Sequence, residues 1–261
     1  MALERRSPPG SKAIRAVTFD LWDTLIRDDS DEPRRKAKGL RTKADERRHL
    51  VWQALDRRRP IALDDVRLAY DVAEAAFNTL WKDHSITWTI AERLAVIFGG
   101  LGRTLPGDEL ERLIEALGRM EVDIPPDPVA GAREALEALS GRYKLCIVSD
   151  TIVTPGARLR DLLEAHGLKR YFAGFAFSDE VGHSKPDPAM FRSAASQLGV
   201  GVTEMVHVGD RDHNDVRGPQ ALGMKAVLFT AVSDADKDGT SADAVCDSHA
   251  SLPGAIDALA G

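Results

Sequence analysis

The sequence predicts a doubly wound α/β fold: a parallel sheet covered by helices on both faces, with a helical cap inserted after the first strand. Three observations lead to this fold class. Residues 13–19 form a short apolar run typical of a buried strand, the segment that follows shows only helical periodicity, and helices alternate with strands from residue 126 onward. We therefore expect a core of residues 13–28 and 126–261 and a cap of residues 29–125.

The composition narrows the class of protein. The chain has 261 residues, of which 43% are hydrophobic, and a formal net charge of −6, which is typical of a globular protein and unlike a nucleic-acid binder. No apolar stretch approaches the roughly 20 residues of a membrane helix. Residues 1–12 are predicted to be a loose tail without the apolar stretch of a secretory signal. The two cysteines, Cys146 and Cys246, argue against a disulfide framework and favour the cytoplasm, with Cys146 a buried small hydrophobe.

The segment after the first strand combines a charged run with helical periodicity. Residues 28–48 mix both charges densely and offer almost nothing to bury, so we interpret them as a solvated linker or helix face. From residue 50 to about 117, apolar residues recur at three- and four-residue spacings, which predicts amphipathic helices, one of them ending at Gly99-Gly100. The apolar faces are Val66, Ala69, Ala73, Ala76, Phe77 and Leu80; Ile90, Leu94, Ile97 and Phe98; and Leu110, Leu113, Ile114 and Leu117.

The pattern changes at Ile124-Pro125-Pro126, after which short apolar runs alternate with helical segments. Glycines at 167, 199 and 223 mark three helix ends. The predicted strands are 144–148, 174–178, 205–208 and 225–229, with a short last one at 244–245. The predicted helices are 130–139, 157–165, 188–198, 216–222 and 252–259.

Chemically useful residues follow several of the predicted strands. Asp20 follows the first strand, Ser149 and Asp150 end the second, and Asp210 ends the strand at 205–208. In doubly wound sheets, ligands bind beyond the carboxyl ends of the strands. Carboxylates, a hydroxyl and a lysine, brought together there, can bind a divalent cation and a dianion.

These residues resemble the motifs of the haloacid dehalogenase superfamily, all four of which have a counterpart in the correct order. The motifs are FDLWDTL (19–25), the serine of IVSDT (Ser149), the lysine of GHSKPDPAMF (Lys185) and HVGDRDHNDVRGPQALGM (207–224). The resemblance covers about residues 13–28 and 126–261. It implies a Rossmann-like core, a helical C1 cap at residues 29–125 and a hydrolase acting on a small molecule, as a monomer or homodimer.

The resemblance implies roles for individual residues. Asp20 is the expected nucleophile, because a carboxylate forms an ester or acyl-phosphate that water then breaks. Lys185 is expected to stabilise charge in the transition state. Ser149 is expected to donate a hydrogen bond to a phosphoryl oxygen, and Asp150 and Trp22 to line the substrate site.

The resemblance also implies a Mg²⁺ site. Its expected ligands are Asp20, the backbone carbonyl of Trp22 and Asp210, while Asp215 holds a metal-bound water or orients the lysine. Gly209 lets the backbone approach closely.

One position departs from the phosphatase pattern. The residue two after the nucleophile is usually a second aspartate that protonates the leaving oxygen, and here it is Trp22. Such general acid help contributes roughly 10²–10⁴-fold, and its loss matters least for acyl, aryl or enol phosphates. Asp23 is a possible substitute, although the next residue along an extended chain points the other way. The indole can instead line the substrate pocket or pack beneath the cap.

Three functions remain open from the sequence. The first is a Mg²⁺-dependent phosphatase. The second is a 2-haloacid dehalogenase that attacks carbon through Asp20 without metal, since that branch also lacks the second aspartate. The third is a degenerate protein that binds phosphate or a partner without turnover. The GD-x₄-D spacing of Asp210 and Asp215 favours the phosphatase, and the intact Asp20 opposes the third function.

Further polar residues lie near these motifs. We interpret His207, His213 and Asp212 as structural or solvated, and His183 as a weaker candidate for the mouth of the site. The basic residues of the charged segment either contact an anionic substrate or are solvated: Arg34, Arg35, Lys36, Lys38 and Arg41.

Overall fold

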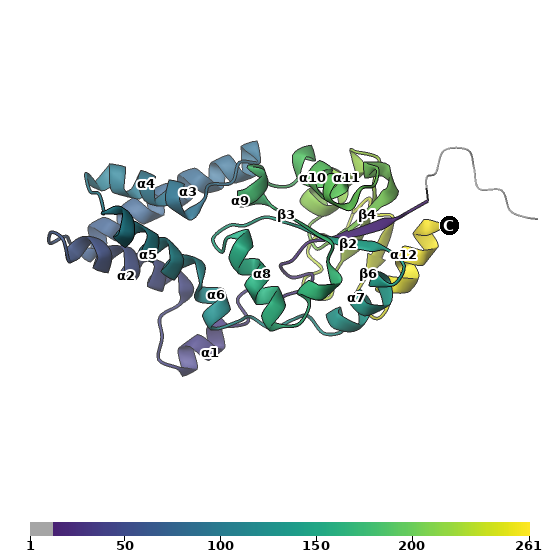
Figure 1. Ribbon diagram of the computed structural model, residues 1–261, viewed down its shortest axis with the longest axis horizontal. Coiled ribbons are helices and arrows are strands. Elements are labelled where there is room, and N and C mark those ends of the chain that lie inside the picture. The colour runs from purple at the N-terminus through teal and green to yellow at the C-terminus, as the bar shows by residue number, and fades with distance from the viewer. Residues whose placement is uncertain (1–12) are drawn as a thin grey trace, which may run out of the picture.

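A six-stranded parallel sheet in the order β3-β2-β1-β4-β5-β6 forms the centre of the protein (Figure 1). The structure, a computed structural model, describes residues 13–261, and the predicted tail at 1–12 lies outside them. The predicted doubly wound α/β fold is confirmed. The strands are β1 (Ala16–Phe19), β2 (Lys144–Ser149), β3 (Gly174–Phe177), β4 (Met205–Gly209), β5 (Lys225–Phe229) and β6 (Ala244–Cys246).

Helices cover both faces of the sheet because side chains alternate along each strand. Val17 and Phe19 of β1 belong to an apolar cluster with residues of α7 (Ala132–Ser140), α8 (Gly156–Ala165) and α12 (Leu252–Ala260). Ala16, on the other face, belongs to a cluster with α10 (Pro188–Leu198). The carboxyl ends of β1, β2 and β4, which are neighbours in the sheet, therefore open onto one edge.

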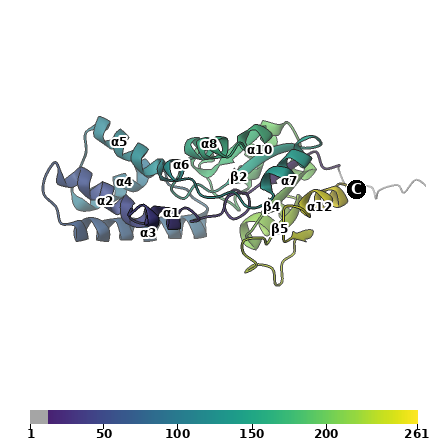
Figure 2. The ribbon, with the colours of Figure 1, turned by 90° about the horizontal axis from the view of Figure 1, so that it is seen from below.

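Between β1 and α7 the described residues form helices and loops but no named strand, and the helices lie to one side of the sheet (Figure 2). Its four longest helices enclose an apolar cluster of their own, separate from the clusters on the sheet. The helices are α1 (Glu32–Ala37), α2 (Lys43–Asp56), α3 (Leu63–His84), α4 (Ile90–Leu101), α5 (Gly107–Gly118) and α6 (Met120–Asp123).

Two predicted helix boundaries are wrong. The helix α4 continues through Gly99-Gly100 to Leu101 and is capped by Gly102, whose φ of +60° is the left-handed conformation that closes many helices. The helix predicted at 216–222 is instead a π-helical turn, η3 (Asp212–Arg217), followed by the short α11 (Gly218–Gln220). The remaining short elements are α9 (Ser178–Val181), η1 (Lys169–Tyr171) and η2 (Val202–Glu204).

Two chain crossings connect the helical segment to the core. The outgoing crossing is the chain around residues 27–31, before α1, and the returning crossing is the chain around residues 124–128, after α6. They run side by side: Arg27 N–H donates to the Asp127 carbonyl (2.9 Å), and Asp127 N–H donates to the Ser30 hydroxyl (2.7 Å). Arg34 adds an ion pair with Asp127 at 2.7 Å. The two crossings therefore form one hydrogen-bonded base for the cap.

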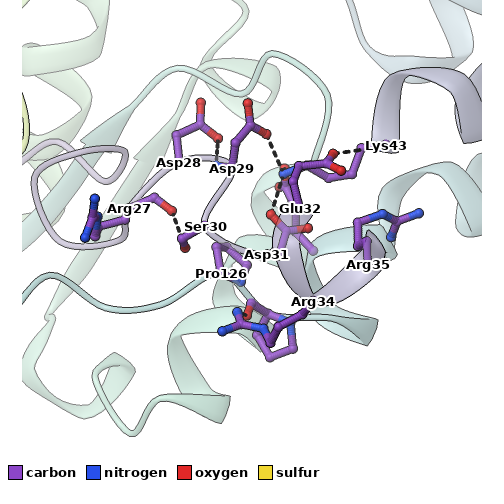
Figure 3. Close-up of polar contacts among 12 residues, drawn as sticks. Arg27, Asp28, Asp29, Ser30, Asp31, Glu32, Arg34, Arg35, Lys43 and Pro126 are labelled. Carbon is purple, nitrogen blue, oxygen red and sulfur yellow. Dashed lines mark hydrogen bonds and ion pairs between the residues drawn. The ribbon is translucent and has the colours of Figure 1, made fainter. Parts of the chain in front are cut away.

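A buried lysine lies at the base of the cap (Figure 3). The Lys43 ammonium is 3.0 Å from Asp29, 2.9 Å from Asp31 and 3.0 Å from Glu121, which joins the outgoing crossing to α6. Asp31, Arg35 and Lys43 are all buried. The interpretation of residues 28–48 as a solvated segment is thus wrong at these positions, because charges distant in sequence offset the cost of burial.

None of the helices among residues 13–261 combines the length and apolar character that a membrane span requires.

Candidate active site

Lys185 and two carboxylates form the centre of the candidate site. The Lys185 ammonium lies 2.8 Å from Asp20 Oδ1 and 2.6 Å from Asp215 Oδ1, and all three side chains are buried. Asp20 directly follows β1, and its N–H donates to the Val208 carbonyl (2.8 Å), so pairing with β4 holds its backbone. The opposite charges offset one another's loss of water.

Asp215 is held by two further groups. His207 Nε2 lies 3.0 Å from Oδ1, and the N–H of Arg211 donates to Oδ2 at 3.0 Å. Burial lowers the pKa of His207, so the ring is neutral, with Nε2–H donating to Asp215 and Nδ1 accepting from the Thr18 hydroxyl (2.8 Å). A Cβ at Gly209 would lie 2.3 Å from Asp215 Cγ, so only glycine fits there. His207 is therefore structural, and it orients Asp215.

The end of β2 supplies a hydroxyl and a carboxylate. Ser149 is fully buried, and its Oγ has no hydrogen-bond partner among the described residues. Asp150 accepts from the Lys185 N–H (2.8 Å) and from Nε1 of Trp81 in α3 (3.2 Å). Burial raises the pKa of Asp150 to about 6, although Lys185 opposes the shift. A buried hydroxyl is rarely left unpaired, so Ser149 fits a site that receives an acceptor oxygen.

Asp210, at the end of β4, differs from the other carboxylates. Its side chain makes no hydrogen bond or ion pair within residues 13–261, and its Oδ1 is buried. One oxygen each of Asp20, Asp210 and Asp215 lie within 4.8 Å of one another. Carboxylate oxygens are the preferred ligands of Mg²⁺, so this group fits a hard divalent cation.

The pKa values reflect this surplus of negative charge. Burial raises the pKa of Asp210 to about 8, and the charges of Asp20 and Asp215 add to the shift. Burial acts in the same direction on Asp215, but Lys185 and His207 hold its pKa below the ordinary value. Burial opposes the charge of Lys185, but Asp20 and Asp215 raise its pKa above the usual range. Near neutral pH one carboxyl therefore keeps a proton that a bound cation would displace.

Trp22 and Asp23 face different surroundings. Trp22 is half-buried and lines the cavity beside Asp20. Asp23 has a positive φ of 51°, and its Oδ1 accepts from the N–H of Asp28 (3.0 Å), at the start of the outgoing crossing. Asp23 is not among the residues that line the cavity, so its carboxylate does not take the place of the missing acid there.

A cavity of about 30 Å³ lies between the ends of the strands and the cap. This volume holds roughly two or three water molecules. Sequence reasoning missed four of its lining residues: Arg211 and Asn214 lie inside the fourth motif, but nothing in the sequence indicates Trp81 or Ile152. The lining residues are Asp20, Trp22, Trp81, Ser149, Asp150, Ile152, Lys185, Arg211, Asn214 and Asp215.

The other polar candidates lie away from the cavity. His183 is exposed and 3.5 Å from Asp187, and His213 is exposed. Asp212 is buried and accepts from the Thr240 hydroxyl (2.6 Å). None of these residues lines the cavity, nor do the basic residues Arg34, Arg35, Lys36, Lys38 and Arg41.

Comparisons with known proteins agree on one family. A family model described as haloacid dehalogenase-like hydrolase matches residues 14–223. The chain is similar to a phosphoserine phosphatase of Thermus thermophilus, with 32% identity over 164 residues that cover 60% of this chain and 64% of the relative. The chain spans less than two thirds of the length of the first curated relatives it matches.

Solved structures share the whole architecture. A HAD phosphatase from Thermococcus onnurineus has a TM-score of 0.59 and 25% identity, covering 92% of this chain and 96% of that one. A 2-haloacid dehalogenase from Pseudomonas syringae has a TM-score of 0.67 and 23% identity, covering 94% and 99%. At that identity, the second likeness bears on the fold alone.

Proposed function

Because the chain belongs to the haloacid dehalogenase-like hydrolase family, we propose that it is a Mg²⁺-dependent phosphatase acting on a small phosphorylated metabolite through an aspartyl-phosphate on Asp20. The observation that carries this proposal is Asp210, a carboxylate beside the Asp20–Lys185 pair that no described cation contacts. A nucleophilic carboxylate serves attack on phosphorus or on carbon, whereas a surplus carboxylate calls for a hard cation.

Asp20 is the proposed nucleophile. Its oxygen attacks phosphorus, the bond to the leaving oxygen breaks with its electron pair, and water later cleaves the acyl-phosphate to release inorganic phosphate. Lys185, 2.8 Å from Asp20, stabilises the charge on the transferring group. Ser149, with its unpaired hydroxyl, donates to a phosphoryl oxygen.

Asp20, Asp210 and the backbone carbonyl of Trp22 are the proposed Mg²⁺ ligands. Asp215 either completes the set or orients Lys185, as its 2.6 Å contact supports. When bound, Mg²⁺ neutralises charge on the phosphoryl oxygens. Asp150 positions the Lys185 loop by accepting from its backbone N–H.

The absence of an acid at position 22 restricts the substrate. Trp22 cannot protonate a leaving alkoxide, and Asp23 is bonded to the Asp28 backbone. Acid catalysis contributes roughly 10²–10⁴-fold. We therefore expect acyl, aryl and enol phosphates to react faster than alkyl phosphates.

The test is metal-dependent phosphate release. The protein is incubated with acetyl phosphate and p-nitrophenyl phosphate, with and without Mg²⁺, beside the Asp20→Asn variant. We expect turnover with Mg²⁺ only, and a loss of at least about 10³-fold in Asp20→Asn. Turnover that survives in Asp20→Asn would remove Asp20 from its role, and no phosphate release from either substrate would favour a binding protein.

The second candidate function is 2-haloacid dehalogenation, and Trp22 is the observation that favours it. In that reaction the Asp20 carboxylate attacks carbon and no cation is needed. It therefore gives no role to the Asp210 carboxylate. Chloride release from 2-chloropropionate in the presence of a chelator would support this function over the phosphatase.

A further inference from the structure

We propose that Arg211 binds a carboxylate on the leaving group, so that the substrates of this site are small acidic phosphates of the acyl, aryl or enol type. This inference rests on the proposed phosphatase function and specifies its substrate class.

Arg211 is a cation at the cavity that pairs with no carboxylate among the described residues. It directly follows Asp210, lines the cavity, and its side chain is exposed. Among residues 13–261 its guanidinium makes no ion pair and donates no hydrogen bond, although its backbone N–H is bonded to Asp215. Its five N–H donors are therefore available to a ligand.

The position of Arg211 is set by the cap. The guanidinium carbon lies 5.7 Å from the centre of the Trp81 ring, within the range of a cation–π contact. Trp81 belongs to α3, and its Nε1–H is already donated to Asp150. The guanidinium, which follows the end of β4, therefore lies beside a cap residue that lines the same cavity.

The remaining wall offers little else to a leaving group. Trp22, Trp81 and Ile152 present apolar surface, and Asn214 is the one neutral amide among the lining residues. A leaving group on this side would contact mainly apolar surface. An anionic end on that group would find its donor in Arg211, because a planar guanidinium binds carboxylates through two parallel hydrogen bonds.

The net charge of the site also favours substrates whose leaving group carries a carboxylate. Four carboxylates lie near Arg211: Asp20, Asp150, Asp210 and Asp215. Lys185 and a divalent cation together carry three positive charges against them. A substrate with both a phosphate and a carboxylate would enter a site of negative charge unless Arg211 balanced it, so the arginine is required most for doubly acidic substrates.

The test compares two substrates in two proteins. The substrates are 3-carboxyphenyl phosphate and 3-carbamoylphenyl phosphate, which have similar shape and both have phenolic leaving groups that need little protonation. We expect wild type to prefer the carboxylate by about 10- to 100-fold in kcat/KM, and Arg211→Met to lose this preference. Intrinsic reactivity cancels, because the readout is the ratio of the two substrates in each protein.

Two controls separate a binding role from a general one. Arg211→Lys keeps a positive charge but not the planar fork, so it should retain only part of the preference. Arg217→Met removes another exposed arginine of the same loop, one that pairs with Asp212 outside the cavity, and it should retain the full preference.

The outcomes distinguish this inference from the proposed function. Hydrolysis of both substrates without a preference, or a preference unchanged in Arg211→Met, overturns the role of Arg211 and leaves the phosphatase intact. Calorimetric binding of both substrates to Asp20→Asn, with and without Arg211→Met, gives the same comparison without turnover. If the carboxylate does not bind more tightly there, the inference is wrong whatever the activity.

Discussion

Two buried lysines, Lys185 in the core and Lys43 at the base of the cap, are both surrounded by carboxylates, yet they differ in what they leave unpaired. An ammonium has three N–H donors. Lys43 contacts three carboxylates within 3.0 Å, those of Asp29, Asp31 and Glu121. Within the described chain, Lys185 contacts only two, those of Asp20 and Asp215.

The difference separates a structural cluster from a reactive one. At the base of the cap the ammonium contacts all three carboxylates, although Asp31 Oδ2 and Glu121 Oε2 have no hydrogen-bond partner among the described residues. In the core one donor of Lys185 is free, Ser149 Oγ is unpaired, and the Asp210 carboxylate has no partner within residues 13–261. Each carboxylate of the Lys43 cluster contacts a cation, whereas Asp210 contacts none within residues 13–261. A carboxylate without any partner, beside a free ammonium donor, therefore indicates a ligand site more clearly than burial or charge does.

The largest expected effect is the loss of activity when Lys185 is replaced. Replacing Lys185 with Met should lower kcat/KM for p-nitrophenyl phosphate by about 10³-fold, because the transferring group loses its stabilising charge. Lys43→Met should remain within about threefold of wild type per folded molecule, since its ammonium has no free donor. Steady-state kinetics on both variants checks this. Equal losses in the two variants would show that the clusters do not differ in role.

The second effect concerns stability at the base of the cap. Lys43→Met leaves the buried Asp31 and Glu121 without their counter-charge, so the free energy of unfolding should fall by about 3–5 kcal/mol. Urea unfolding followed by tryptophan fluorescence measures it.

Two variants control this measurement. Arg41→Met, which removes an exposed ion pair with Glu46, should cost less than about 1 kcal/mol. Adding Asp31→Asn to Lys43→Met should restore part of the loss. A cost for Lys43→Met no greater than that of Arg41→Met would argue against the buried cluster.

The third effect is the pH dependence of Mg²⁺ binding beside Lys185. A cation must displace the proton of Asp210, whose pKa is raised to about 8 first by burial and then by Asp20 and Asp215. The Kd for Mg²⁺ should therefore fall up to about tenfold per pH unit from about pH 6 to 7.5 and level off above pH 8. Calorimetry measures this slope. Asp210→Asn should bind weakly with a flatter slope, and an equally steep slope in that variant would assign the proton to another group.

The smallest effect lies beside the Lys43 cluster. The pKa of Asp28 is raised from 3.8 to about 6 by burial, then by Asp29 and Glu121, so the folded state holds this proton more tightly than the unfolded state. Its contribution to stability is present below about pH 3.8 and lost as the pH rises through 6.

Asp28→Asn should therefore be more stable than wild type at pH 8 and equal to it near pH 3.5. The gain should stay below about 1 kcal/mol, because the residue, although partly covered by its neighbours, keeps contact with water that screens its charge. Thermal unfolding at both pH values measures it, and a variant less stable than wild type at pH 8 would contradict the sign.

Particular residues show how far the sequence could be interpreted. Asp20, Ser149 and Asp210 were predicted to lie together because each ends an apolar strand, and parallel strands end at the same edge. Lys185 was grouped with them from the segment GHSKPD, and the resemblance of that motif then gave it a role. Trp81 could not be found, because its place in an amphipathic helix looks like packing until α3 is seen to reach Asp150.

In the charged segment at residues 28–48, the sequence predicted exposure where the structure shows buried charges. Lys43 and Asp31 lie in a run that is typical of solvent-exposed residues, and the contact with Glu121, 78 positions from Lys43, is what allows their burial. Local composition carries no information about so distant a partner.

The sequence by itself determined the order of strands and helices and the residues at the strand ends, because the periods of two and 3.6 residues are local properties of the backbone. The tertiary structure alone decided which charges are buried, that Asp23 is bonded to the outgoing crossing while Trp22 lines the cavity, and that Arg211 lies beside Trp81. These outcomes depend on the packing of the cap against the core, because the cost of burying a charge is set by neighbours that lie far away along the chain.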